Sequence, residues 1–191
     1  MAAYRITQIE TLHEGWRKLL KLTVQMPDGR TMAREILNSQ DATAVLPYDP
    51  ERRKVILIRQ FRAPVMYVEE RSDMMETVAG LLDGGEPEET ARREAMEEAG
   101  LRLGALEPVG RAWSAPGITT ERVSLYLAPY SGTDRVAEGG GLAEEHEEIE
   151  VLEIGIDELA GMLERHAIDD MKTLILAQAL QLKHPELFAK A

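Results

Sequence analysis

The amino-acid sequence predicts a mixed α/β sandwich. Three observations predict it: strand-like segments fill the first part of the chain, a helix with clear end signals follows, and two further helices close the chain after more strands. Because each sheet face and each helix must bury its apolar side against another element, this order favours layers of sheet and helix. The 191 residues, 44% of them hydrophobic, suit one domain with an extension or arm.

The first predicted elements are two strands, over residues 17–26 and 31–37. They flank the turn Pro27-Asp28-Gly29-Arg30, in which proline presets φ and glycine tolerates positive φ. We therefore expect residues 1–42 to form a β-hairpin arm and residues 43–191 to form the main domain.

A second strand pair is predicted over residues 43–48 and 54–62. The unbroken apolar run Val55-Ile56-Leu57-Ile58 indicates a strand that is buried on both faces. The remaining predicted elements follow in chain order. They are a short strand over residues 74–79, a helix over 87–99, strands near 101–113, 121–128 and 149–154, and helices over about 156–165 and about 170–183. The Gly-rich stretch 131–148 is the main loop, and long loops of this kind are functional or disordered.

The helix over residues 87–99 has the strongest local signals. Pro87 suits the first turn, where its missing N–H has no intrahelical partner, and Glu88 and Glu89 suit the same turn through the helix dipole. Gly100 suits the C-terminal stop because glycine accepts a left-handed backbone.

On a helical wheel, this helix separates small residues from carboxylates. Ala91, Ala95 and Ala99 share one face, which can approach a sheet closely, whereas three glutamates are neighbours on the other side: Glu94, Glu97 and Glu98. Adjacent carboxylates repel one another unless a cation lies between them, and Mg²⁺ or Mn²⁺ prefers such oxygen ligands. The alternative interpretation is a solvated acidic helix face.

The whole segment from Gly80 to Leu101 resembles the Nudix box: Gly, five residues, Glu, seven residues, Arg-Glu, apolar, any residue, Glu-Glu, any residue, Gly, apolar. The residues in these roles are Gly80, Glu86, Arg93, Glu94, Ala95, Glu97, Glu98, Gly100 and Leu101. Only six residues separate Glu86 from Arg93, and one residue is about 100° of helix rotation, so the role of Glu86 is open. The shortened spacing is similar to that of Nudix enzymes that hydrolyse GDP-mannose.

The resemblance, which covers about residues 43–183, implies a Nudix-fold α/β/α sandwich and a Mg²⁺-dependent pyrophosphohydrolase, with Mn²⁺ as an alternative ion. The implied substrate is a nucleoside diphosphate sugar, cleaved by water to a nucleoside monophosphate and a sugar 1-phosphate. Glu94 and Glu98 are implied as metal ligands, Glu97 as a further ligand or bridging group, and the carbonyl of Ala79 as another ligand. Arg93 is implied to orient the glutamates.

A second acidic cluster follows the triglycine Gly139–Gly141: Glu144, Glu145, Glu147 and Glu148. One interpretation is a solvated loop. The other is a mobile loop, with glycine hinges, that brings a general base over the metal ions. The segment GGGLAEEHEEIEVLEI resembles the corresponding loop of Nudix enzymes that cleave nucleotide sugars and ADP-ribose, which implies Glu145 as the base, with Glu147 as the close alternative.

Substrate contacts are predicted from two strands. Arg59 and Arg62 lie in the segment RQFR, which resembles one that recurs in this group, and arginine contacts phosphate in bidentate fashion. The alternative for both is a solvent-facing strand end. Glu76 is a candidate contact to nucleoside or sugar, with a simple surface glutamate as the alternative.

Residues 115–121 resemble the S-P-G-G-T-x-E loop of ADP-ribose and sugar-nucleotide hydrolases. Ala115 and Ile118 depart from that pattern, so one hydroxyl contact is lost. The resemblance implies substrate-site roles for Gly117 and Glu121, with a solvated strand-end acid as the alternative for Glu121.

Composition excludes several classes. The net charge of −12 disfavours a general nucleic-acid binder, and no apolar run approaches the about 18 residues of a membrane helix. The absence of cysteine excludes disulfides and thiol chemistry. The N-terminus MAAYRITQIE lacks a signal pattern, so a cytoplasmic location is expected. The resemblance also implies a homodimer that exchanges arm strands. The alternative functions are an ADP-ribose pyrophosphatase and a non-catalytic nucleotide-sensing Nudix module.

Overall fold

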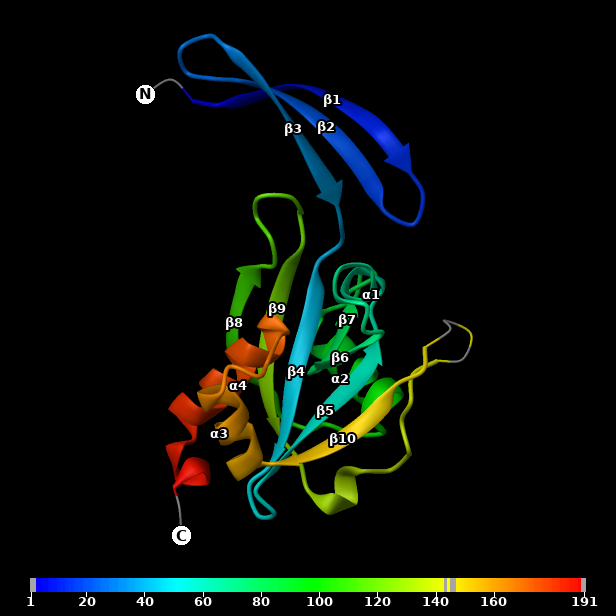
Figure 1. The fold of residues 1–191 in the computed structure, drawn as a ribbon, viewed down its shortest axis with the longest axis vertical. Helices are drawn as coiled ribbons and strands as arrows, with labels where there is room; N and C mark the ends of the chain where they lie inside the picture. The colour runs from blue at the N-terminus through cyan, green and yellow to red at the C-terminus, as the bar shows by residue number, and fades with distance from the viewer. Residues whose placement is uncertain (1–2, 143, 145–146, 190–191) are drawn as a thin grey trace. The chain divides into compact units, whose positions relative to one another are not determined.

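The computed structural model describes residues 3–142, 144 and 147–189 (Figure 1). The chain divides into two compact units, one made of residues 1–41 and 111–123 and the other of residues 42–110 and 124–191. Among the described residues, no helix has both the length and the apolar character needed to cross a membrane.

The first unit contains a three-stranded antiparallel sheet in the order β1-β2-β3, with β1 at Arg5–Glu14, β2 at Lys18–Gln25 and β3 at Thr31–Asn38. The predicted β2–β3 hairpin is confirmed. Strand β1 was not predicted, and its pairing with β2 has register shifts between Ile6 and Gln8 and between Thr11 and His13. Since such irregularities disturb the alternation of side chains, β1 lacks the period-two pattern by which strands are found.

The same unit holds the loop around Gly117, which is hydrogen-bonded to the end of β3. The N–H of Leu37 donates to the carbonyl of Ile118 at 2.7 Å, and the N–H of Thr120 donates to the carbonyl of Leu37 at 3.1 Å. The Thr120 hydroxyl also accepts from the N–H of Ser39 at 2.8 Å. The loop is therefore ordered by backbone pairing with the arm.

The second unit is built on a larger sheet in the order β10-β5-β4-β9-β8, with β6 paired to β5 and β7 paired to β4. The bounds are β4 Ala42–Asp49, β5 Lys54–Phe61, β6 Asp73–Glu76, β7 Val78–Leu81, β8 Glu107–Trp113, β9 Arg122–Pro129 and β10 Glu150–Gly155. The outer ends of β8 and β9 belong to the first unit. The single strand predicted over residues 74–79 is two strands, because the chain changes its partner from β5 to β4 at Thr77.

In the described part of the chain, the α-helices that accompany this sheet are α1 Ala63–Glu69, α2 Pro87–Ala99, α3 Ile156–Glu164 and α4 Met171–Lys183. Short 3-10 helices lie at Gly132–Asp134 and Pro185–Phe188. Helix α2 has the predicted bounds, with Pro87 in its first turn and Gly100 as a left-handed cap at φ 65°. Helix α1 was not predicted, since none of its residues is buried and it shows no apolar stripe.

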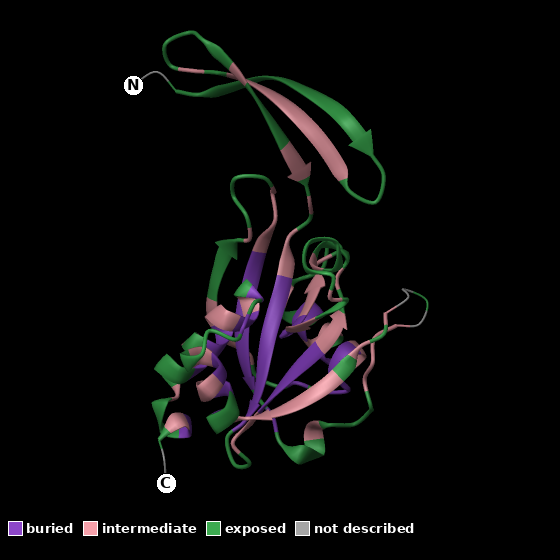
Figure 2. Ribbon diagram, viewed as in Figure 1, coloured by how far each residue is buried: buried purple, intermediate pink, exposed green. Residues whose placement is uncertain are grey.

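The core lies on both faces of the central strands (Figure 2). Val45, Ile56 and Ile58 pack in one cluster with the alanines of α2. Their neighbours along the strands, which include Val55 and Leu57, are equally buried and point to the other face, because side chains alternate along a strand. Figure 1 shows α2 on one side of the sheet and α3 and α4 on the other. The predicted α/β sandwich is confirmed, as is the strand buried on both faces.

Candidate active site

The carboxylates of α2 lie against strand β7. Glu98 Oε2 accepts a hydrogen bond from the N–H of Ala79 at 3.1 Å. A Cβ at Gly80 would lie 2.0 Å from Glu94 Oε1, so only glycine lets this carboxylate come so close to the strand. The box glycine and the box glutamates are therefore complementary parts of one contact between α2 and β7.

Burial changes the protonation of these two glutamates. Glu98 is 2% exposed, and burial raises its pKa well above the usual value, with the charges of Glu94 and Glu147 adding to the effect. Burial also raises the pKa of Glu94 to about 7, with Arg93 opposing the shift and Glu97 and Glu147 adding to it. The alternative of a solvated acidic face is therefore wrong for Glu98 and for Glu94.

Arg93 contacts two of the glutamates. Its Nη2 donates to Glu94 Oε1 at 2.5 Å, and its Nη1 donates to Glu97 Oε2 at 2.7 Å. Glu97 is thereby held toward the outer side of the helix, whereas Glu98 faces β7. The three carboxylates that the wheel placed together therefore differ in exposure: Glu98 is buried, whereas Glu94 and Glu97 are partly buried.

Of the two candidate bases, Glu147 acts electrostatically on both Glu94 and Glu98. Its negative charge raises the pKa of both Glu94 and Glu98, which places it within electrostatic range of each. Glu145 lies outside the described residues, and Glu144 is exposed. The acidic loop is therefore joined to the helix site through Glu147.

The donor chemistry of this site suits a hard divalent cation. Glu94 and Glu98 supply carboxylate oxygens, and Glu147 adds negative charge within electrostatic range of both, so a cation would offset unfavourable charge in this poorly solvated place. Within the described part of the chain, no three such side chains are gathered closely enough to hold an ion as they stand. Arg93 is the cation that Glu94 contacts instead.

We expect the affinity of this site for a divalent cation to rise with pH between about 6 and 8. A metal ligand must be deprotonated, and the pKa of Glu94 is about 7 in the metal-free protein. The same shift makes the metal-free protein less stable as the pH rises from the ordinary glutamate value of 4.5 through 7, because the folded state then binds more protons than the unfolded state.

Calorimetric titration with Mn²⁺ at several pH values, in buffers of different ionisation enthalpy, measures both the affinity and the protons released. Glu94→Gln should flatten the pH dependence of metal-free stability. An affinity that does not change across this range contradicts the prediction.

Glu76 is neither a surface residue nor a free ligand, so the surface alternative is wrong. It is 2% exposed, and both of its oxygens accept hydrogen bonds from Arg62, one of them at 3.0 Å. Lys172, at the start of α4, donates to the same carboxylate at 3.1 Å and to Asp170 at 2.7 Å. The charge of Arg62 also acts on Glu98, so this buried network borders the site.

Lys172 and Asp170 were not among the predicted site residues. Asp170 caps α4, since its carboxylate accepts from the N–H of Thr173 at 2.9 Å. This Asp-x-x-Thr start is visible in the sequence as a helix cap. Its partnership with Glu76 is not visible, because the two residues are far apart along the chain.

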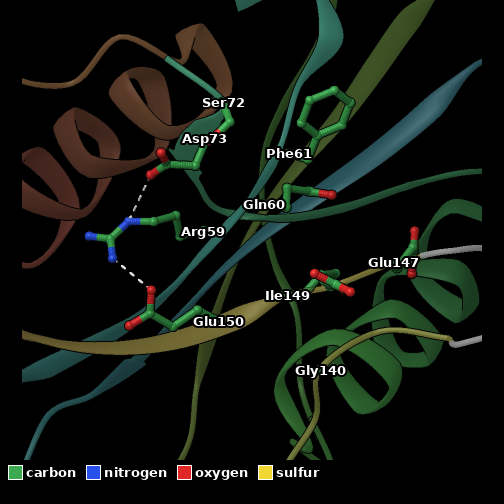
Figure 3. Close-up of a pocket in the computed structure, with 10 residues that line it drawn as sticks. Arg59, Gln60, Phe61, Ser72, Asp73, Gly140, Glu147, Ile149 and Glu150 are labelled. Carbon is green, nitrogen blue, oxygen red and sulfur yellow. Dashed lines mark hydrogen bonds and ion pairs between the residues drawn. The ribbon is translucent and has the colours of Figure 1, made fainter. Parts of the chain in front are cut away.

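Arg59 lies in a cavity of about 900 Å³ beside the acidic loop (Figure 3). Arg59 is paired with Asp73 at 3.3 Å and with Glu150 at 2.6 Å. Other residues that line the cavity are Gln60, Phe61, Ser72, Gly140, Glu147, Glu148 and Ile149. Because Glu147 lines this cavity and also lies near the buried glutamates, the cavity adjoins the candidate metal site.

Three candidate residues remain: Glu86, Gly117 and Glu121. Glu86 is exposed at the N-cap of α2 and makes no side-chain capping bond. Gly117 and Glu121 belong to the first unit, where the N–H of Ser114 donates to the carbonyl of Glu121 at 3.2 Å. The substrate roles of Gly117 and Glu121 remain predictions.

Comparison with known proteins gives a consistent family. The NUDIX domain family matches residues 38–175. The GDP-mannose pyrophosphatase of Cronobacter sakazakii (strain ATCC BAA-894) is 43% identical over 178 residues, which are 90% of this chain and 92% of that protein. The GDP-mannose pyrophosphatase of Escherichia coli O1:K1 / APEC is 38% identical over 152 residues, 79% of this chain and 78% of that protein.

A solved structure agrees at the level of the fold. The crystal structure of an ADP compounds hydrolase superimposes with a TM-score of 0.73 at 20% identity, covering 95% of each chain. Nudix hydrolases generally need a divalent metal ion, which agrees with the carboxylate-rich site on α2. The match to residues 38–175, the box carried by α2 and the shared fold lead to one conclusion: the chain belongs to the Nudix family of hydrolases.

Proposed function

We propose that this chain is a Mg²⁺-dependent pyrophosphohydrolase of nucleoside diphosphate sugars, with GDP-mannose as the favoured substrate. The observation that carries the proposal is the placement of Glu98, which is buried, and Glu94, which is partly buried, against β7, with Glu147 of the acidic loop within electrostatic range of both. The names of the two curated relatives, which match most of this chain, support GDP-mannose.

In the proposed site, Glu94, Glu98 and the carbonyl of Ala79 hold the metal ion, and Glu97 serves as a further or bridging ligand. Arg93 orients Glu94 and Glu97 through the two hydrogen bonds described above. When bound, the ion neutralises phosphate charge and lowers the pKa of a coordinated water.

Glu147 is the proposed general base, and Glu145 is the alternative. The base takes a proton from the attacking water, whose oxygen forms a new bond to one phosphorus of the pyrophosphate. The bond from that phosphorus to the bridging oxygen breaks, and the bridging oxygen leaves with the other phosphate. The products are a nucleoside monophosphate and a sugar 1-phosphate.

The proposed substrate contacts are cationic. Arg59 faces the cavity and can exchange Asp73 or Glu150 for a phosphate, since arginine binds either anion in the same geometry. Arg62 is held by Glu76 next to the metal site, so Glu76 acts on the substrate through Arg62. The arm-mediated homodimer and the cytoplasmic location remain predictions.

A substrate panel tests the proposal. We expect GDP-mannose to show the highest kcat/KM among GDP-mannose, ADP-ribose and UDP-glucose, measured by release of phosphate monoesters with Mg²⁺. A higher kcat/KM for ADP-ribose would support the alternative function, an ADP-ribose pyrophosphatase. If none of the three compounds is hydrolysed with Mg²⁺ or Mn²⁺, the proposal fails, and the result supports a non-catalytic nucleotide-sensing module.

A further inference from the structure

The triglycine Gly139–Gly141 is packed on the C-terminal end of α2. The N–H of Gly140 donates to the carbonyl of Glu98 at 2.9 Å, and the N–H of Gly141 donates to the carbonyl of Glu97 at 3.1 Å. The last carbonyls of a helix have no partner within the helix. The acidic loop therefore caps the helix that carries the site glutamates, at the residues that form the site.

This contact has no room for side chains. A Cβ at Gly139 would lie 2.4 Å from the carbonyl oxygen of Glu98, and a Cβ at Gly141 would lie 2.7 Å from the Cβ of Glu147. Both glycines also have positive φ, +79° and +80°, which side chains rarely adopt. Gly141 is thus required for the approach of Glu147 as well as for the course of the backbone.

Glu147 is tied to the end of the triglycine by its backbone and by its carboxylate. Its N–H donates to the carbonyl of Leu142 at 3.3 Å, and its Oε2 accepts from the N–H of Leu142 at 3.2 Å. The N–H of Ile149 donates back to the carbonyl of Gly140 at 3.2 Å. These bonds fix Glu147 and Ile149 against Gly140 and Leu142.

We propose that the triglycine is a positioning element, with Gly141 as its key residue, that holds Glu147 at the C-terminal end of α2, the helix that carries Glu94 and Glu98, before a metal ion binds. The proposal deepens the proposed function and rests on it for the identity of the reaction. It replaces the hinge interpretation of these glycines with one of close packing. The effect of Glu147 on the pKa of Glu94 and Glu98 agrees with this placement.

The test is Gly141→Ala, studied in the full-length protein. We expect the added methyl group to displace Glu147. Since the negative charge of Glu147 acts on Glu94 and Glu98 and favours a cation there, the Kd for Mn²⁺ should rise, and displacement of the proposed base should lower kcat for GDP-mannose, each by about 10- to 100-fold, while KM stays close to the wild-type value. Calorimetric titration measures Mn²⁺ binding, and steady-state kinetics separate kcat from KM. A purely structural role would leave the Mn²⁺ affinity of the folded fraction unchanged.

Two further variants separate the contact from backbone strain. Gly29→Ala is the matched control, because Gly29 has φ +89° and no atom within 4 Å of an added Cβ. It should lower the melting temperature and leave Mn²⁺ affinity and kcat unchanged. Gly141→Asn serves if Gly141→Ala does not fold, because asparagine tolerates a left-handed backbone but still carries a Cβ.

The outcomes distinguish this proposal from the proposed function. If the folded Gly141 variants bind Mn²⁺ as the wild type does, the positioning role is overturned, whatever substrates are hydrolysed. If the wild type hydrolyses no substrate of the panel, but Gly141→Ala and Glu147→Gln both weaken Mn²⁺ binding, the positioning role holds and the proposed function fails.

Discussion

Glu98→Gln is expected to lower kcat by at least about 100-fold without lowering the stability of the metal-free protein. A neutral amide is a poor ligand for Mg²⁺ compared with a carboxylate. The amide oxygen can still accept the hydrogen bond that the N–H of Ala79 donates to Glu98. Since burial already favours the uncharged form of Glu98, the substitution introduces no new buried charge.

Kinetics at saturating Mg²⁺ and melting curves with and without Mg²⁺ measure the two parts of this prediction. Mg²⁺ should raise the melting temperature of the wild type and have little effect on that of the variant, because a ligand stabilises only the protein that binds it. Glu88→Gln is the matched control on the exposed side of the same helix, and it should retain wild-type kinetics. An unchanged kcat for Glu98→Gln would refute the metal role of this residue.

Glu76→Ala is expected to destabilise the protein by about 2 to 3 kcal/mol, the upper range for losing hydrogen bonds to a charged group, because Arg62 remains partly exposed to water. Glu76 is 2% exposed and accepts hydrogen bonds from Arg62 and Lys172. Its removal leaves Arg62 without its bidentate partner. For a chain of this length the melting temperature should fall by about 10 °C.

Chemical denaturation provides the free energy of unfolding for this comparison. Glu69→Ala is the control, because it removes one of two carboxylates from Arg71 at the surface, where Glu69 is 55% exposed. An exposed pair of this kind is worth about 1 kcal/mol or less. If Glu76→Ala and Glu69→Ala lower the free energy of unfolding equally, the hydrogen bonds of Glu76 with Arg62 and Lys172 do not stabilise the fold more than a surface pair does.

Several features of this protein were predictable because their causes are local. The bounds of α2 follow from Pro87 and Gly100, and both residues act within one turn of the helix. The strand at Val55–Ile58 is fully buried because an unbroken apolar run suits a strand covered on both faces. The box spacing likewise brings Glu94 and Glu98 to one side of α2, since residues four apart are neighbours on a helix.

Other features depend on pairings that a short segment does not contain. Strand β1 is exposed and paired with two irregularities, so its side chains lack a regular period. The segment is divided into β6 and β7 because β6 pairs with β5, whereas β7 pairs with β4.

The chemistry of the site divides in the same way. The residue types and spacing along α2 were sufficient to predict a carboxylate site for a divalent ion, because helix geometry is set by neighbouring residues. The burial of Glu98 against Ala79, the approach of Glu147 and the engagement of Glu76 by Lys172 were decided by tertiary structure alone. Each of these contacts depends on where distant segments of the chain meet. The free energy of burying a charge depends on the partners and the solvent around it, and these are set by the tertiary structure.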